Sequence, residues 1–427
     1  MRLLSELKHV VTDQRDIVWV LAAQGWGRVA RGEEGQLIFT TAGTPPEVFA
    51  EAWTEHGLVT RLEPGSSLRT QDAERTLIER ARFESAHSHG FTVYRRTLFS
   101  RLPISGSFRW GDSVQLRPCS GDIAIDEPQG WMLDRDVLRS LLPRHDGPPF
   151  PMILEVRVPK SPNRWIEENR WRQRLDFWQN TFAVFVPGDI GYWQIGHPDH
   201  VWTSVIEDGV ARNRLAMQAF SGEPTQSSAL ADPEPAALDR SENFYDRISS
   251  TFSELTFPDS LPNDLGVLEK LSDDERSAFA RASYWFSVGV RARSEQNRAV
   301  AIVAFSAAVE CLLPKLKASK CPCCGKTKRP SITNLFKRHL SKFATAPNKE
   351  LENIQKRLYD TRSALVHGSY APDIDIGPFS PARDDTTHSS LEWWARKSLI
   401  NWVRASDRSK WHEQEGSSGG VTPSKDA

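Results

Sequence analysis

Residues 298–313 read Arg-Ala-Val-Ala-Ile-Val-Ala-Phe-Ser-Ala-Ala-Val-Glu-Cys-Leu-Leu, and Pro314 follows directly. Apolar side chains recur in this stretch at the spacing of helix turns, which predicts a helix from about Glu295 to Leu313. Proline cannot continue a helix, so Pro314 marks its end. The side chains predicted to form its core-facing stripe are Val300, Val303, Ala304, Ala307 and Cys311.

Three neighbouring segments predict further helices. Ser272 to Glu275 have the pattern of a capping box, which starts a helix. A third helix is predicted from about Asn348 to His367, and a fourth from about Ser389 to Ala405. Four such helices predict an all-α antiparallel bundle over residues 237–410. Their apolar positions are Phe279, Ala282, Ser283, Phe286 and Val290, then Leu351, Ile354, Leu358 and Leu365, then Leu391, Trp394, Ala395, Leu399 and Trp402.

The first half of the chain has mixed patterns and predicts an α+β region over residues 1–221. Residues 222–236 are polar and rich in proline, as in a linker, and residues 411–427 have the composition of a disordered tail. By analogy with two-part defence proteins, the first region would sense or regulate. The predicted strands are 17–22, 36–41, 114–126, 152–158 and 182–195, and the predicted helices are 46–57, 72–86 and 163–178.

The composition is that of an ordinary globular protein. Of 427 residues, 39% are hydrophobic and 26% are charged, and the net charge is −1, so an anionic partner must be met by a local basic patch. No run of 18 apolar residues predicts a transmembrane helix, and the start has no apolar stretch of a secretory signal. The five cysteines are an odd number and do not suggest a disulfide framework. We therefore expect a cytoplasmic protein without a membrane partner.

The residues most suggestive of chemistry are Arg362 and His367, which form an Arg-x4-His pattern. The same spacing recurs at Arg82/His87, in the other half, and at Arg383/His388, which has the composition of a loop. Only Arg362/His367 lies at the end of a well-patterned bundle helix. Residues five apart differ by about 140° around a helix. The two side chains can therefore meet only if the last turn is loosened, which Gly368 as a C-cap would allow, or if two chains form a dimer.

An Arg and a His together suit cleavage of RNA without a metal. The ribose 2′-hydroxyl is the nucleophile, a His can transfer its proton, and an Arg can hold the phosphate. The structural alternative is a capping His beside an Arg in an ion pair. Glu310 lies near the apolar stripe of its helix and calls for a cationic partner, for which Arg362 is the candidate.

Cys321, Cys323 and Cys324 lie within four positions and have the spacing of one zinc knuckle. Zinc takes four ligands, and two knuckles usually supply them. His339 or a second chain would have to complete the site, so a structural zinc and a reduced metal-free loop both remain open. No His-Glu pair at metal-ligand spacing accompanies the cysteines, which disfavours a zinc enzyme.

Residues 314–347 read as an insert between two bundle helices, rich in Cys and Lys. Between Glu310 and Glu350 the chain has ten Lys and Arg residues and no acid. Such a basic stretch suits phosphate contacts with RNA, although a solvated loop would look the same. The candidate RNA-binding residues are Lys326, Lys328, Arg329, Lys337 and Arg338.

Three segments together resemble the Apea-like HEPN domain: residues 284–293, 304–313 and 358–368. The last reads Leu-Tyr-Asp-Thr-Arg-Ser-Ala-Leu-Val-His-Gly and is similar to the Tyr-x-x-Arg-Ser-x-x-Val-His-Gly form of the family's Arg-x(4–6)-His motif. The resemblance covers about residues 240–410, under half of the chain.

The resemblance implies a HEPN helical bundle that dimerises across the motif. The implied activity is metal-independent endoribonuclease, often in bacterial anti-phage or toxin systems. Arg362 and His367 take the motif positions, Ser363 takes the polar position after the Arg, and Glu310 matches an acid frequent on the preceding helix. The family also includes catalytically silent members, so a non-catalytic module that binds RNA or protein is the alternative.

Overall fold

A computed structural model describes residues 2–118, 150–187, 234–246, 253–314, 331–344, 359–367 and 383–408, with short gaps in the first and fourth ranges, and a few short strands between them. The helices are α1 Arg2–Val10, α2 Asp16–Gly25, α3 Gln71–Ser85, α5 Arg164–Phe185, α6 Leu261–Glu269, α7 Asp273–Ser294, α8 Arg298–Glu310, α9 Ile332–Phe343 and α12 Arg383–Arg404, with a 3-10 turn at Phe244–Asp246. Residues 359–366 are also helical. Among the described residues, no helix has the length and apolar character needed to cross a membrane.

Among the described residues, two sheets have four and five strands, and four two-stranded pairs stand apart from them. The strands are β1 Val29–Arg31, β2 Gln36–Thr40, β3 Val48–Glu55, β4 Leu58–Pro64, β5 Phe91–Ser100, β6 Phe108–Trp110, β7 Val114–Pro118, β8 Ile123–Ala124, β9 Met132–Leu133, β10 Phe150–Pro159, β11 Trp202–Glu207, β12 Val210–Leu215, β13 Pro224–Thr225, β14 Leu238–Asp239, β15 Phe257–Pro258, β16 Ser319–Lys320 and β17 Thr327–Lys328. The fold is therefore mixed α+β, with most helices in the second half.

The first lobe is a four-stranded antiparallel sheet in the order β1-β2-β3-β4, packed against α1, α2 and α3. Its core includes Leu7, Ile17, Leu21, Phe39 and Leu77. Two predictions were wrong here: residues 17–22 belong to helix α2, and residues 46–57 contain strand β3. The predictions of a strand at 36–41 and a helix at 72–86 are confirmed by β2 and α3.

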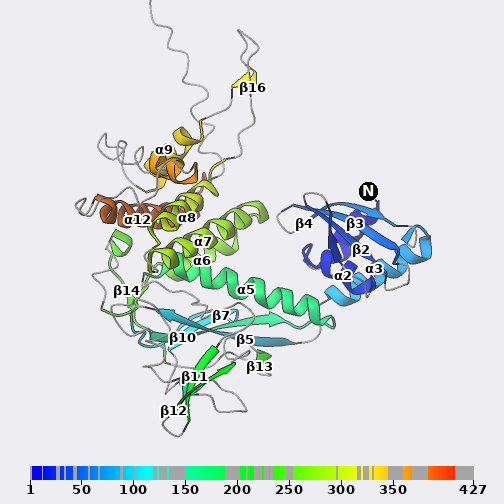
Figure 1. The fold of residues 1–427 in the computed structure, drawn as a ribbon, viewed down its shortest axis with the longest axis horizontal. Coiled ribbons are helices and arrows are strands. Elements are labelled where there is room, and N and C mark those ends of the chain that lie inside the picture. Colours follow the sequence, from blue (N-terminus) through cyan, green and yellow to red (C-terminus); the bar gives the residue numbers. More distant parts are fainter. Residues whose placement is uncertain are drawn as a thin grey trace, which may run out of the picture.

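The second lobe contains an antiparallel sheet in the order β13-β5-β10-β7-β6. Its apolar face carries Leu98, Leu154 and Leu116, which pack against α5 in one core. Figure 1 shows α5 lying between this sheet and helices α6, α7 and α8. Helix α5 confirms the helix predicted at 163–178 but runs on to Phe185, so the strand predicted at 182–195 was wrong at its start.

The sheet and the helices of the second lobe share a single hydrophobic core. The core extends from Tyr94 on β5 to Val403 on α12 and passes through Phe182 on α5. Part of the predicted linker also joins this lobe, since Pro224 pairs with Tyr94 on β5 and Ala236 donates its backbone N–H to Ser107. The core thus runs across the predicted boundary at 222–236.

Within the bundle, the predicted start of α7 is confirmed by its capping box. The Ser272 backbone N–H donates to Glu275 Oε2 at 3.1 Å, and the Glu275 N–H donates to Ser272 Oγ at 3.3 Å. All five predicted apolar positions of α7 are buried, as are the five of α12. A Cβ added at Gly289 would lie 2.7 Å from Phe305 Cδ1, so α7 and α8 approach closely at this point.

Helix α8 exists as predicted, but it buries a different face. Its buried residues are Ala301, Ile302, Ala304, Phe305, Ser306, Ala308 and Val309. In the predicted stripe only Ala304 is buried, and Val300 is 42% exposed. The helix is apolar on nearly all sides, so spacing alone did not identify the core face. Of the other residues in the predicted stripe, Val300 is exposed, and Val303, Ala307 and Cys311 are half-buried.

Candidate functional site around Arg362

Arg362 lies on the helical segment 359–366 and faces helix α8. Its Nη2 atom donates to Glu310 Oε2 at 3.0 Å, and both side chains are 23% exposed. The predicted partnership of Glu310 with Arg362 is therefore confirmed. Glu310 is the last residue of α8, where a carboxylate opposes the helix dipole and benefits from a nearby cation.

The contact between Glu310 and Arg362 uses only part of the hydrogen-bonding capacity of the two side chains. Burial raises the pKa of the Glu310 carboxyl, and the charge and hydrogen bond of Arg362 oppose that rise. Glu310 Oε1 and Arg362 Nε are buried without a hydrogen-bond partner. Since a guanidinium carries five N–H donors, Arg362 retains donors for a further anion at its partly exposed edge.

An aromatic contact links the motif segment to α9. The Arg362 guanidinium carbon lies 5.8 Å from the centre of the Tyr359 ring, and that ring lies 5.3 Å from Phe336 on α9. Tyr359 is the first residue of the helical segment 359–366, but no role in the site was predicted for it from the sequence. Its position three residues before Arg362, on one helix face, was the signal that could have revealed it.

His367 is exposed at the end of the motif segment. Its backbone N–H donates to the Ser363 carbonyl at 3.0 Å, which is a regular helical hydrogen bond. The last turn is therefore not loosened at His367, and the imidazole leaves the helix about 140° away from Arg362. The structure does not bring the two side chains together on one chain. Ser363 is half-buried between them, and Gly368 lies outside the described residues.

The cysteine cluster lies outside the described residues, so its geometry is open. Strands β16 and β17 pair antiparallel on either side of it, with Ser319 opposite Lys328. His339 on α9, a candidate fourth ligand, has no exposed surface and lies 4.7 Å from the Phe343 ring. Burial lowers the pKa of His339 to about 3. His339 is thus a buried core residue, and no group of three metal-ligating side chains occurs in the part of the chain that is described.

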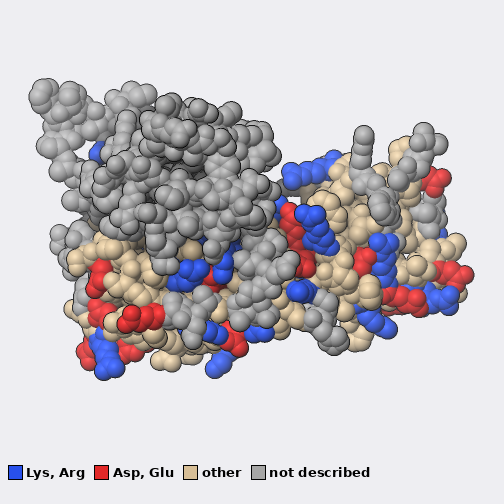
Figure 2. Space-filling view, turned by 90° about the horizontal axis from the view of Figure 1, so that it is seen from below, with Lys and Arg blue, Asp and Glu red and all other residues tan. Residues whose placement is uncertain are grey.

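The predicted insert at 314–347 is partly a core element. Helix α9 buries Leu335, Phe336 and Leu340, so this part of the stretch packs into the bundle. Lys337 and Arg338 lie on α9 and are half-buried, while the side chains of Lys326, Lys328 and Arg329 lie outside the described residues. On the face seen in Figure 2, basic and acidic side chains are interspersed over the described part of the chain.

The other two Arg-x4-His pairs have different surroundings. Arg82 lies on α3 of the first lobe, and His87 is outside the described residues. Arg383 begins α12, and the helix continues through His388, so the loop predicted there was wrong. Arg362 differs from Arg82 in its contact with the half-buried acid Glu310, since both lie on helices.

Comparison with models of known protein families, with curated proteins and with solved structures finds no match. The site is thus defined by its own geometry. A cation held by Glu310 and framed by Tyr359 lies one helix turn before an exposed imidazole. Such a site can bind a phosphate through Arg362, and His367 can transfer a proton to a substrate that reaches it.

Proposed function

We propose that the chain is a HEPN-type endoribonuclease that needs no metal for catalysis and uses Arg362 and His367. The observation that carries the proposal is the contact of Arg362 with Glu310, which fixes a guanidinium at the end of the motif helix while leaving donors free for phosphate. In this mechanism the 2′-hydroxyl attacks the adjacent phosphate and expels the 5′-oxygen, giving a 2′,3′-cyclic phosphate. His367 transfers the proton, and Arg362 stabilises the charge that develops on the phosphate.

The proposal requires a homodimer, because His367 and Arg362 of one chain diverge by about 140°. A two-fold axis beside the motif would place the His367 of each chain near the Arg362 of its partner. Two exposed apolar side chains, Val300 on α8 and Val366 on the motif helix, support such an assembly. Val300 is 42% exposed and Val366 is 51% exposed, and apolar surface of this kind is covered in stable dimers.

The roles of the remaining residues follow from their positions. Glu310 holds Arg362, and Ser363 lies between the two catalytic groups. Phe336 contacts Tyr359, so α9 brings Lys337 and Arg338 to the neighbourhood of the motif helix, where they would attract RNA. The cysteine cluster would hold a structural zinc rather than take part in cleavage. We place this activity in the cytoplasm of a bacterium, as part of a defence or toxin system regulated by the first lobe.

A non-catalytic RNA- or protein-binding module is the second candidate. One observation favours it: the regular hydrogen bond from His367 to Ser363 keeps the imidazole apart from Arg362. In that case the Arg362–Glu310 pair only joins two helices, and the basic residues retain RNA without cutting it.

An assay of total RNA cleavage in the presence of EDTA distinguishes the nuclease from the non-catalytic binding module. The wild-type protein should produce fragments that end in 2′,3′-cyclic phosphate, and His367→Ala should lower the rate at least a hundredfold. Asp360→Asn is the matched control, because Asp360 is exposed on the same helical segment and has no part in the proposed site. RNA that is retained on the wild-type protein but remains intact would support the binding module and remove the nuclease proposal.

A further inference from the structure

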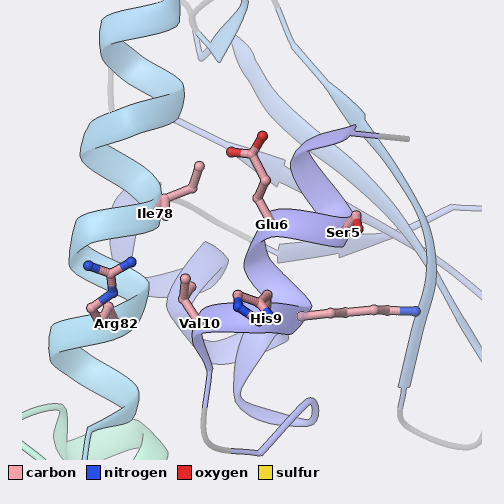
Figure 3. A pocket seen from close by; sticks show the side chains of 7 residues that line it. Ser5, Glu6, His9, Val10, Ile78 and Arg82 are labelled. Carbon is pink, nitrogen blue, oxygen red and sulfur yellow. The ribbon is translucent and has the colours of Figure 1, made fainter.

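A cavity of about 590 Å³ opens between α1 and α3 in the first lobe. Figure 3 shows Ile78 and Arg82 on α3 facing Glu6, His9 and Val10 on α1. Its volume falls in the range of small-molecule sites. The cavity belongs to the other lobe from Arg362 and is lined by none of the residues of that site.

The charge of the cavity is positive. Lys8, His9 and Arg82 line it, and none of their side chains has an acidic partner within the described part of the chain. The single lining acid, Glu6, is already bound to Arg2, whose Nε lies 2.7 Å from Glu6 Oε1. The lining therefore carries two cations, Lys8 and Arg82, against the one carboxylate of Glu6, and His9 adds a further basic group.

The cavity also has an apolar wall. Val10 and Ile78 line it and pack on their other side against the core of the first lobe. A ligand that fits both features has an anionic group for the bases and a compact apolar body for Val10 and Ile78. A phosphate monoester carries about two negative charges and several acceptor oxygens, which suits three bases better than a single carboxylate.

We propose that this cavity is a binding site for a phosphate monoester with a small apolar or aromatic body. Arg82 is the principal contact, because a guanidinium can hold two phosphate oxygens at once. The Arg-x4-His spacing at Arg82 is then unrelated to RNA cleavage. Arg82 is conspicuous because its side chain is exposed at the cavity with no partner among the described residues.

Titration calorimetry of the full chain with phenyl phosphate tests the site. Phenyl phosphate should bind, and Arg82→Gln should weaken the binding at least tenfold. Arg75→Gln is the matched control, since Arg75 lies on the same helix, pairs with Asp72 at 3.1 Å and is outside the cavity. His367→Ala should bind like the wild type, so the result does not depend on the nuclease proposal.

Three further ligands define the chemical class. Inorganic phosphate should bind more weakly than phenyl phosphate, because it lacks the apolar body, and benzyl alcohol should not bind. Benzoate should bind at least tenfold more weakly than phenyl phosphate. The proposal is overturned if phenyl phosphate does not bind, if Arg82→Gln and Arg75→Gln bind it equally, or if benzoate binds as tightly.

Discussion

Arg362 on the motif helix and Glu310 at the end of α8 are joined by a 3.0 Å contact across 52 residues of sequence. Each side chain is 23% exposed, so the pair is neither a surface ion pair nor a fully buried one. Its strength follows from this position. Water screens it only partly, while the edge of the guanidinium stays within reach of a ligand.

Glu310→Gln should lower the free energy of unfolding by about 1–2 kcal/mol, because a hydrogen bond between charged groups is lost. Glu310→Arg alone should be worse, since two guanidinium groups would then face each other. Combining Glu310→Arg with Arg362→Glu should recover most of the loss. Urea denaturation measures all three.

Asp360→Asn provides the control for this experiment, because Asp360 is exposed on the same helical segment. Its stability should stay within about 0.5 kcal/mol of the wild type. If the double swap loses as much unfolding free energy as the two single swaps lose together, the contact does not stabilise the fold.

The ion pair could be predicted from sequence because the need of Glu310 for a cation is visible in its own helix. Glu310 follows an apolar stripe at helical spacing and calls for a cation wherever the helix packs. The buried faces of α7 and α12 could also be predicted, because the polar and apolar sides of these helices differ clearly. In α8 nearly every position is apolar, so periodicity predicted the helix but not the face toward the core.

The wrong prediction of a strand at residues 17–22 in the first lobe has a similar cause. Ile17, Val18, Trp19, Val20 and Leu21 form an apolar, β-branched run, which suits a strand and a buried helix equally. Burial of Ile17, Val20 and Leu21 at helical spacing decides for the helix, and that depends on contacts with the rest of the lobe. The divergence of His367 from Arg362 also needed coordinates, since only the backbone hydrogen bond to Ser363 shows that the last turn is regular.

Two glycines in helices should respond to alanine in opposite ways. At Gly289 a new Cβ would lie 2.7 Å from the fully buried Phe305 ring, so Gly289→Ala should destabilise by about 1–2 kcal/mol after the gain in helix propensity. At Gly266 the nearest atom is Trp110 Cη2 at 3.6 Å, an ordinary contact. Gly266→Ala should therefore stabilise by about 0.5–1 kcal/mol. Calorimetric melting of Gly289→Ala at or above the wild-type temperature would contradict the close packing of α7 and α8.

Arg396 on α12 should be the strongest single polar link between α12 and α5. Its Nη1 donates to the carbonyls of Ala183 at 2.9 Å and Val184 at 2.8 Å, near the end of α5, and its Nη2 donates to Glu392 at 3.2 Å. Arg396→Met would leave these carbonyls unpaired and should cost about 3 kcal/mol.

The matched change is Arg404→Met, which removes the exposed end of a bidentate pair with Asp264 at 2.7 Å. Arg404 is 37% exposed against 8% for Arg396, and the Ser260 hydroxyl still donates to the buried Asp264 carboxylate at 3.1 Å after the change, so the loss should be smaller. Equal losses in chemical denaturation would show that the buried contact with α5 adds no more than the exposed one.

The joint between the two lobes should make stability depend on pH. Asp16 on α2 is 1% exposed and contacts Arg170 on α5, which also donates to the Ser85 carbonyl at 2.8 Å. Burial raises the pKa of Asp16 to about 6, although Arg170 opposes the rise. An unfolded Asp has a pKa of about 3.9, so between these values the folded chain binds more protons than the unfolded one. The stabilisation that the protonated Asp16 carboxyl gives the folded state is therefore complete below about pH 3.9 and is lost as the pH rises through 6. This stabilisation should reach about 3 kcal/mol at most.

Asp16→Asn cannot ionise, so urea denaturation from pH 4 to pH 7 should give a flatter profile of unfolding free energy against pH for this variant than for the wild type. If the two profiles run parallel, Asp16 stays ionised against Arg170 throughout, and the ion pair rather than burial governs the joint.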